Sequence, residues 1–244
     1  MKNSYKILII FVLLSGKLLA QEEIGKIKYS IKTSWVSKYC SLDYYSEKEK
    51  ESFRYRYGKD YAYTYSSTLI FNKDSSYYFE KEEDNYSKDE IFKIYRDFNN
   101  NTTCDYIFML NKLYLIKDSI TYPKWKILND IKEIAGHICM NAYYYDSIKS
   151  QSIVAWFALD IQKPLAPERF GGLPGAILEV DINNGTKTIT AEKIEIQTEK
   201  VKIKNLKQKG KIREIKEEEY KSLIKAHMIE CRKMKRPYFY GIRY

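Results

Sequence analysis

The feature that most constrains the fold is a glycine- and proline-rich cluster that runs directly into an apolar segment. Over Phe170–Glu179 the chain reads Phe-Gly-Gly-Leu-Pro-Gly-Ala-Ile-Leu-Glu. Proline fixes φ and donates no backbone hydrogen bond, whereas glycine permits positive φ and close approach of another backbone. We therefore predict a rigid corner that leads into a buried strand, Ala176–Ile182. The Asn-Gly step in Asn183–Gly185 then predicts a tight turn into a second strand, Thr186–Gln197.

Short segments rich in β-branched and aromatic residues recur along most of the chain, and such segments favour strands. Turn-forming residues separate them. Ile91–Phe98 is ambiguous between a strand and a short helix, and Ile161–Gly175, with three of the five prolines, predicts a long ordered connection. The other predicted strands are Ile24–Val36, Thr68–Asn72, Ser76–Glu80, Cys104–Leu110, Lys112–Ile116, Lys124–Asn129, Gly136–Asp146 and Ser152–Asp160.

A single helix is predicted near the C-terminus. Glu214–Lys235 carries an imperfect apolar stripe, with acidic residues early and basic residues late, which suits the helix dipole. Pro237 ends this helix, and we expect the aromatic tail, Tyr238–Tyr244, to pack back as a strand. The sequence thus predicts an α+β, mainly antiparallel β fold. We expect a curved sheet packed by the C-terminal helix, reminiscent of the half-barrel of periplasmic lipoprotein carriers, which is an analogy of fold alone.

A series of aromatic residues occupies only odd positions. In a strand, residues two apart share a face, so a hairpin around Gly58–Asp60 would place all of them on one side of a sheet. Ordinary cross-strand aromatic packing is the simpler interpretation, and a tyrosine-lined ligand surface is the alternative. The series comprises Phe53, Tyr55, Tyr57, Tyr61, Tyr63 and Tyr65.

The first twenty residues have the order of a secretory signal peptide. Lys2 and Lys6 precede an apolar core over Ile7–Leu14, and Ala20 is a small residue suited to cleavage. The apolar run is shorter than the ~20 residues that a membrane span needs. We predict a signal peptide over 1–20 without a lipidation cysteine, a single β-rich domain over 21–244, no transmembrane segment after cleavage, and a periplasmic or otherwise exported protein.

The charge and the cysteines restrict function only loosely. The net charge of +10 admits nucleic acid, an anionic membrane surface or acidic partners, but export argues against nucleic acid. The four cysteines are scattered, which excludes a Cys-x-x-Cys redox motif and is not typical of a zinc site. Three disulfide pairings remain possible, as do buried free thiols; the cysteines are Cys40, Cys104, Cys139 and Cys231.

The familiar catalytic motifs are missing from the sequence. The two histidines, His137 and His227, lie far apart, and there is no His-Glu-x-x-His helix, no Gly-x-Ser-x-Gly elbow and no phosphate-binding loop. The acidic residues fall mostly in charged runs, where a solvated face is the default interpretation. We therefore expect no enzyme, no catalytic residue, no cofactor and no metal.

Three blocks between Trp125 and Glu179 resemble the GLPGLI family of bacterial envelope proteins in order and spacing. Ala176 replaces the leucine of the signature, and His137 stands where that family usually has tyrosine. The family has no assigned activity, so the resemblance supplies no catalytic residues. The first block is Trp125 and Ile127 together with Ile134–Cys139 and Ala142, the second is Ala155–Ala158 with Asp160 and Ile161, and the third is Pro167, Phe170 and Gly172–Glu179.

The leading hypothesis is a non-enzymatic carrier that binds a lipid, an acylated chain or a peptide in an apolar groove. The alternative is a partner of an outer-membrane transport complex that docks through the basic segment Lys200–Lys211 and the basic end of the predicted helix. A hydrolase whose site forms only in three dimensions is a third possibility. The candidate ligand-binding residues are Trp125, Trp156, Phe157, Phe170, Leu173, Pro174, Tyr55 and Tyr63.

Overall fold

The computed structural model describes residues 24–58, 61–80, 91–197 and 211–244. The signal peptide expected at 1–20 and nearly all of the basic segment Lys200–Lys211 lie outside this range. Within it, one open sheet of twelve strands runs in the order β12-β6-β5-β4-β3-β2-β1-β11-β10-β9-β8-β7. The strands are β1 (Ile24–Ser34), β2 (Ala62–Phe71), β3 (Ser75–Phe79), β4 (Phe92–Asp97), β5 (Thr102–Met109), β6 (Lys112–Ser119), β7 (Lys126–Ile134), β8 (His137–Asp146), β9 (Gln151–Ala158), β10 (Ile177–Ile182), β11 (Lys187–Gln197) and β12 (Ile212–Ile215).

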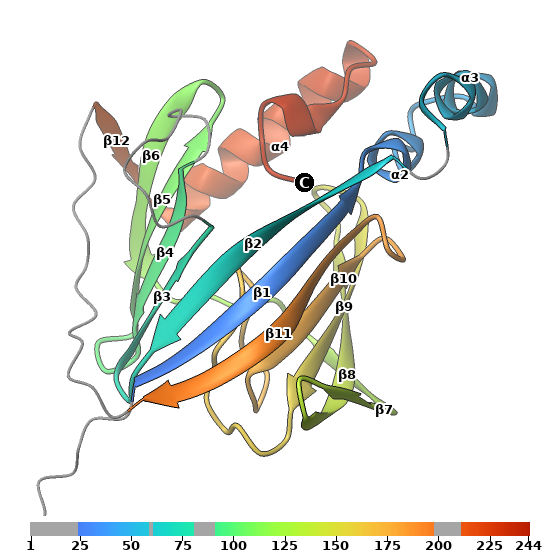
Figure 1. Cartoon of the computed structure of the whole chain (residues 1–244). Coiled ribbons are helices and arrows are strands. Elements are labelled where there is room, and N and C mark those ends of the chain that lie inside the picture. The colour runs from blue at the N-terminus through green and yellow to red at the C-terminus, as the bar shows by residue number, and fades with distance from the viewer. Residues whose placement is uncertain (1–23, 59–60, 81–90, 198–210) are drawn as a thin grey trace, which may run out of the picture.

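The predicted α+β, mainly antiparallel class is confirmed. Every neighbouring pair of described strands is antiparallel except β12 and β6, which are parallel. Figure 1 shows that the sheet bends around its central strands β1, β2 and β11, while α4 (Glu217–Lys233) lies on the side toward which the two wings turn. None of the described helices is long and apolar enough to span a bilayer.

The predicted hairpin after the glycine- and proline-rich cluster is also confirmed. β10 pairs with β11, and Asn183, Asn184 and Gly185 between them all have φ near the left-handed value, at 52°, 51° and 84°. Asparagine and glycine tolerate this conformation best, which explains the local sequence. The corner before β10 needs glycine for a different reason: a Cβ on Gly175 would lie 1.9 Å from the carbonyl oxygen of Ala158.

The predicted aromatic hairpin is wrong in its first half. Phe53, Tyr55 and Tyr57 belong to a helix, α3 (Glu47–Tyr57), instead of a strand. Ser46 and Glu49 form a capping box at its start, and this reciprocal pair satisfies amide groups that a helix otherwise leaves unpaired. Residues that are two positions apart in a helix do not lie on the same face, so the odd-numbered aromatic residues do not form one surface.

Three further elements differ from the sequence-based expectation. A short helix, α2 (Trp35–Cys40), follows β1. The helix predicted from Glu214 begins at Glu217, because Ile212–Ile215 instead forms β12 and pairs with β6. The C-terminal tail packs back as predicted, but Tyr238–Tyr240 forms a short 3-10 helix, η2, and no strand.

The core lies on the concave side of the sheet. Ile27, Tyr29 and Ile31 lie at alternate positions of β1, and all three side chains are fully buried. The hydroxyl of Tyr29 donates to the carbonyl of Ile177 at 2.8 Å. Helix α4 covers this side with Ile224, Met228 and Cys231. All four cysteines are free: Cys40 is half-buried, and the other three are buried. No disulfide therefore joins them.

Candidate functional site

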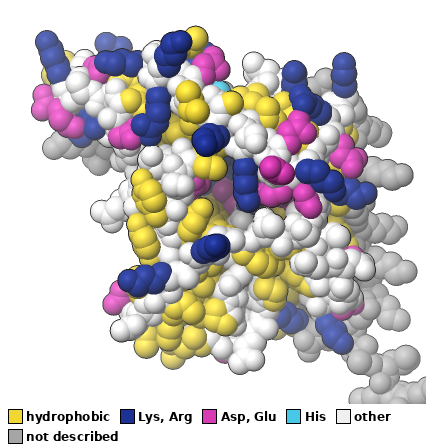
Figure 2. Space-filling model, turned by 180° about the vertical axis from the view of Figure 1, so that it is seen from behind, with side chains coloured by type: hydrophobic (Ala, Val, Ile, Leu, Met, Phe, Trp, Pro, Cys, Tyr) yellow, Lys and Arg dark blue, Asp and Glu magenta, His cyan; other side chains and the backbone are white. Residues whose placement is uncertain are grey.

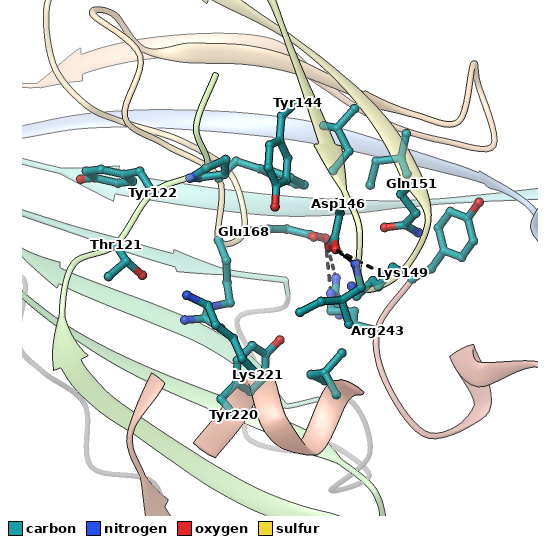
Figure 3. A pocket seen from close by; sticks show the side chains of 18 of the residues that line it. Thr121, Tyr122, Tyr144, Asp146, Lys149, Gln151, Glu168, Tyr220, Lys221 and Arg243 are labelled. Atoms are coloured by element: carbon teal, nitrogen blue, oxygen red, sulfur yellow. Dashed lines mark hydrogen bonds and ion pairs between the residues drawn. The ribbon is translucent and has the colours of Figure 1, made fainter. Parts of the chain in front are cut away.

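A cavity of about 220 Å³ opens between β8, β9, helix α4 and the C-terminal tail. Its walls come from segments that are far apart in the sequence, including the 121–123 linker and the 168–170 part of the connection before β10. Figure 3 shows charged and aromatic side chains converging on it, with Tyr144 on one side and Tyr220 and Lys221 of α4 on the other. Near the centre of the face in Figure 2, basic and acidic side chains gather around a hollow.

Glu168 is the centre of a buried ion-pair network at this cavity. Its carboxylate accepts from Lys187 Nζ at 2.6 Å and from Arg243 Nη2 at 2.9 Å, and Arg243 also pairs with Glu80. Glu168 is 5 % exposed and Lys187 2 % exposed. Burial alone would lower the pKa of Lys187, but the charge of Glu168 outweighs it and raises that pKa. The network thus keeps its charges in a largely dehydrated place.

A second network is built around Arg169, the next residue. Its Nε lies 2.9 Å from Oδ2 of Asp105, and its Nη2 lies 2.5 Å from Oε2 of Glu217, the first residue of α4. The guanidinium also lies over the ring of Tyr220, 4.3 Å from the centroid. Burial acts to lower the pKa of Arg169, but Asp105 chiefly, together with Tyr220 and Glu217, raises it. This network connects β5, the 168–170 segment and helix α4.

Arg96 of β4 holds the backbone of the 168–170 segment through hydrogen bonds to its carbonyl groups. Arg96 Nη2 donates to the carbonyl of Glu168 at 3.0 Å and to that of Phe170 at 3.1 Å. Glu168 has a φ of 50°, in the left-handed region that a residue with a Cβ rarely adopts. These contacts offset the backbone strain at Glu168 and fix the direction in which the side chains of Glu168 and Arg169 point.

Lys149 differs from the other cations around the cavity. Among the described residues, its ammonium has no ion-pair or hydrogen-bond partner, although Lys149 lines the cavity. Its backbone N–H donates to Oδ1 of Asp146 at 3.2 Å, which fixes the turn between β8 and β9. Burial lowers the pKa of Lys149 because the charged form is poorly solvated there. An ammonium in this position is available to a ligand.

One wall of the cavity is aromatic. Phe170 and Tyr144 line it, and Trp125 packs behind them with ring centroids 6.4 Å and 5.8 Å away. The indole Nε1 of Trp125 donates to the carbonyl of Gly171 at 2.6 Å. The cavity therefore combines a flat apolar wall with an ionic floor, and this combination suits a ligand that has both apolar faces and polar groups.

The two carboxylates that line the cavity with cationic partners, Glu168 and Glu217, are poorly placed for proton transfer or metal binding. Glu168 and Glu217 are each held by two cationic side chains, which commits their lone pairs to positioning. No three His, Cys, Asp or Glu side chains converge as metal ligands in the part of the chain that the structure describes. The arrangement fits binding of a polar ligand better than acid–base chemistry.

The residues proposed from sequence do not lie together. Phe170 lines the cavity and Trp125 supports it, whereas Phe157 and Leu173 are buried in the core. The others lie elsewhere: Trp156 is on the opposite face of β9 from Phe157, with Lys132 Nζ 4.2 Å from its ring centroid, Pro174 is exposed, Tyr55 is 95 % exposed on α3, and Tyr63 is 44 % exposed on β2.

The sequence analysis did not identify the charged residues of the cavity. Their partners are distant along the chain, and an acidic or basic residue usually marks a solvated face. One signal was available: Glu168 and Arg169 stand inside a connection rich in proline and glycine, between Pro167 and Phe170. Charges at the start of a tightly packed segment have to find partners, so they are better candidates than charges in polar runs.

Comparisons with known proteins find one matching family from sequence and solved structures with a similar fold. Residues 47–222 match the family described as "N-glycanase peptide, N-terminal domain". Two solved structures of PNGF-II, in space groups C2 and P21, share the fold with TM-scores of 0.52 and 0.56 at 17 % identity. They cover 83 % of this chain, which spans about a third of their length (32 % and 33 %). None of the curated protein sequences matches the chain.

These findings overturn four expectations from sequence. The resemblance to the GLPGLI family is wrong, because residues 47–222 match the N-glycanase family instead. The non-enzymatic lipid or peptide carrier and the outer-membrane partner are contradicted by a family named for an N-glycanase, and so is the expectation that the protein is not an enzyme. The chain belongs to the family of N-glycanase peptide N-terminal domains.

Proposed function

We propose that this chain binds N-linked glycans in the cavity beside Glu168 and serves the removal of those glycans from glycoproteins. The family name supplies the substrate class. The observation that carries the proposal is the pairing of an aromatic wall, Tyr144 and Phe170, with a floor of fixed charged groups. Sugar rings present C–H faces that pack on aromatic rings, and their hydroxyl groups hydrogen-bond to charged side chains.

The preorganised floor supports this proposal further. Arg169 and Glu168 are each held by at least two partners, so they do not have to be reordered when a ligand enters. A preorganised site loses less conformational entropy on binding than a flexible one. The size of the cavity, about 220 Å³, suits a single sugar unit at the end or branch of a larger glycan.

Two expectations from sequence remain proposals beside this one. We propose that the chain is exported, because the order of residues 1–20 is that of a signal peptide and N-linked glycoproteins occur mainly outside the cytoplasm. We also keep the half-barrel comparison as a proposal about shape alone, because the sheet bends around its central strands (Figure 1).

The proposal is tested with an N-glycosylated peptide and the same peptide without its glycan. We expect the purified chain to bind only the glycosylated form in calorimetry. Tyr144→Ala should weaken this binding about tenfold, because it removes the ring that lines the cavity. The matched control is Tyr145→Ala, whose side chain is 50 % exposed on the other face of the same strand.

Mass spectrometry of the same mixtures shows whether the glycan leaves the peptide. Release by the chain alone would place the N-glycanase activity in this domain, and binding without release would make it the substrate-binding part of a larger assembly. Equal binding of the two peptides, or an equal loss in Tyr144→Ala and Tyr145→Ala, would contradict a glycan site in this cavity.

A further inference from the structure

The interior around the cavity holds more cations than carboxylates. The described cationic residues are Lys38, Arg96, Lys149, Arg169, Lys187 and Arg243, and the carboxylates are Glu80, Asp105, Asp146, Glu168 and Glu217. Lys221 also lines the cavity, but its side chain is exposed. The excess of positive charge lies in a poorly solvated region, where a charge interacts more strongly than in water.

Each carboxylate that lines the cavity already has partners. Glu168 accepts from Lys187 and Arg243, and Glu217 accepts from Arg169 with Lys221 3.4 Å away. Asp146 accepts the backbone N–H groups of the β8–β9 turn at 2.9 Å and 3.2 Å. These carboxylates are thus engaged within the protein, and among the described residues none of them forms an ion pair with Lys149.

Lys149 is the cation of this group that faces the cavity without a partner among the described residues. Burial lowers its pKa, with Asp146 and Glu168 opposing that effect and Lys187 and Arg169 adding to it. Lys38, which lies deeper, has a pKa lowered to about 7 by burial and by the charges of Lys187, Arg243 and Lys149. Burial is the largest cause of both shifts, so this interior is a poorly solvated place for a positive charge.

We infer that the cavity selects a sugar unit that carries one negative charge, with the anionic group bound by Lys149 Nζ. This inference rests on the proposed glycan-binding function and names the kind of glycan. A single free ammonium matches a singly charged group, such as a sugar carboxylate or a sulfate ester, better than a doubly charged phosphate monoester. The ring of the sugar lies against Tyr144 and Phe170.

The test compares three versions of one oligosaccharide: neutral, ending in a sugar carboxylate, and carrying a sulfate ester. We expect the wild-type chain to bind at least one charged version about tenfold more tightly than the neutral version. Lys149→Met keeps the length of the side chain and removes the charge. It should abolish this preference and leave the affinity for the neutral version within about twofold.

Two further variants separate a ligand contact from a general effect. Lys149→Arg keeps the charge and should restore part of the preference. Lys225→Met removes an exposed charge from α4, away from the cavity, and should change nothing. If Lys149→Met does not fold, the salt dependence of the wild type serves instead: added salt should weaken binding of the charged version and leave binding of the neutral one unchanged.

The outcomes distinguish this inference from the function on which it rests. Equal binding of neutral and charged versions by the wild type, or a preference that survives Lys149→Met, would overturn the selection of an anionic sugar and leave the glycan site intact. A folded protein that binds none of the three versions would overturn the proposed function itself. Preference for the carboxylate over the sulfate, or the reverse, identifies the anionic group.

Discussion

The two halves of the connection between β9 and β10 are both buried, but different interactions hold them in place. In the first half, Glu168 and Arg169 are charged, and each is held by partners from distant elements. In the second half, Gly175 and Ala176 are buried, and the backbone at Gly175 passes so close to Ala158 that a side chain would not fit at that position. One half depends on electrostatic pairing over the whole domain, and the other depends on local steric fit.

The difference shows how a single connection can be both a structural corner and the floor of a site. Close packing leaves no room for a ligand, so the second half can only support the sheet. Charged groups held by others still present polar atoms to the cavity, so the first half can bind. A buried ion pair is a costly way to gain stability, which favours a role in binding for the first half.

The largest effect is expected when the charged half is broken. Glu168→Gln leaves Lys187 and Arg243 without their shared carboxylate in a buried place, which should lower the free energy of unfolding by about 3–5 kcal/mol. Urea denaturation measures this change. Glu230→Gln is the control, because it breaks an ion pair with Arg236 in which both side chains are about half exposed and should cost under ~1 kcal/mol. Similar losses in the two variants would mean that the Glu168 network does little for stability.

A smaller loss is expected when the steric half is broken. Gly175→Ala places a Cβ 1.9 Å from the Ala158 carbonyl oxygen, so the backbone has to shift, at a cost of about 2–3 kcal/mol. Gly185→Ala is the matched control: its Cβ meets no atom within 4 Å, and only its φ of 84° opposes the change, at about 1 kcal/mol. Thermal unfolding compares the two. The steric interpretation is wrong if Gly185→Ala is the more damaging change.

The smallest effect on stability is expected for Lys38, a buried lysine without an ion-pair partner among the described residues. Lys38 lies against the rings of Trp35, Phe239 and Tyr244, and its pKa is lowered to about 7 in the folded protein. The unfolded chain therefore binds more protons at this position between pH 7 and about pH 10. Stability from this residue should rise with pH across that window, by about 2 kcal/mol from pH 7 to pH 9.

Lys38→Met removes the titrating group and should flatten this rise while increasing stability at pH 7. Denaturation of both proteins at several pH values isolates the contribution of Lys38 from that of other groups. A parallel pH dependence in wild type and variant would show that the three rings keep the ammonium charged, as cation–π contacts can do.

The sequence predicted what local physics decides. The Asn183–Gly185 turn, the strands beside it and the corner at Gly175 follow from the conformational preferences of a few adjacent residues. The same method failed at Phe53–Tyr57, where alternation suggested a strand but the capping box of Ser46 and Glu49 starts a helix. Two short-range signals competed there, and the capping signal was the stronger one.

The site could not be predicted because its contacts are not local. Glu168 meets Lys187 across 19 positions and Arg243 across 75, and Arg169 meets Glu217 across 48. No pattern of spacing relates such residues until the strand order is known. Phe170, which was proposed from sequence and lines the cavity, belongs to the glycine- and proline-rich cluster, which is itself local.

The position of Arg243 in the C-terminal tail has a consequence for the order of folding. Hairpins such as β10–β11 close short loops and can form early, whereas the contact between Arg243 and Glu168 closes a loop of 75 positions. We therefore expect the cavity to mature after the sheet. A chain caught partway through folding would already have most of its strands paired and would still be unable to recognise a ligand.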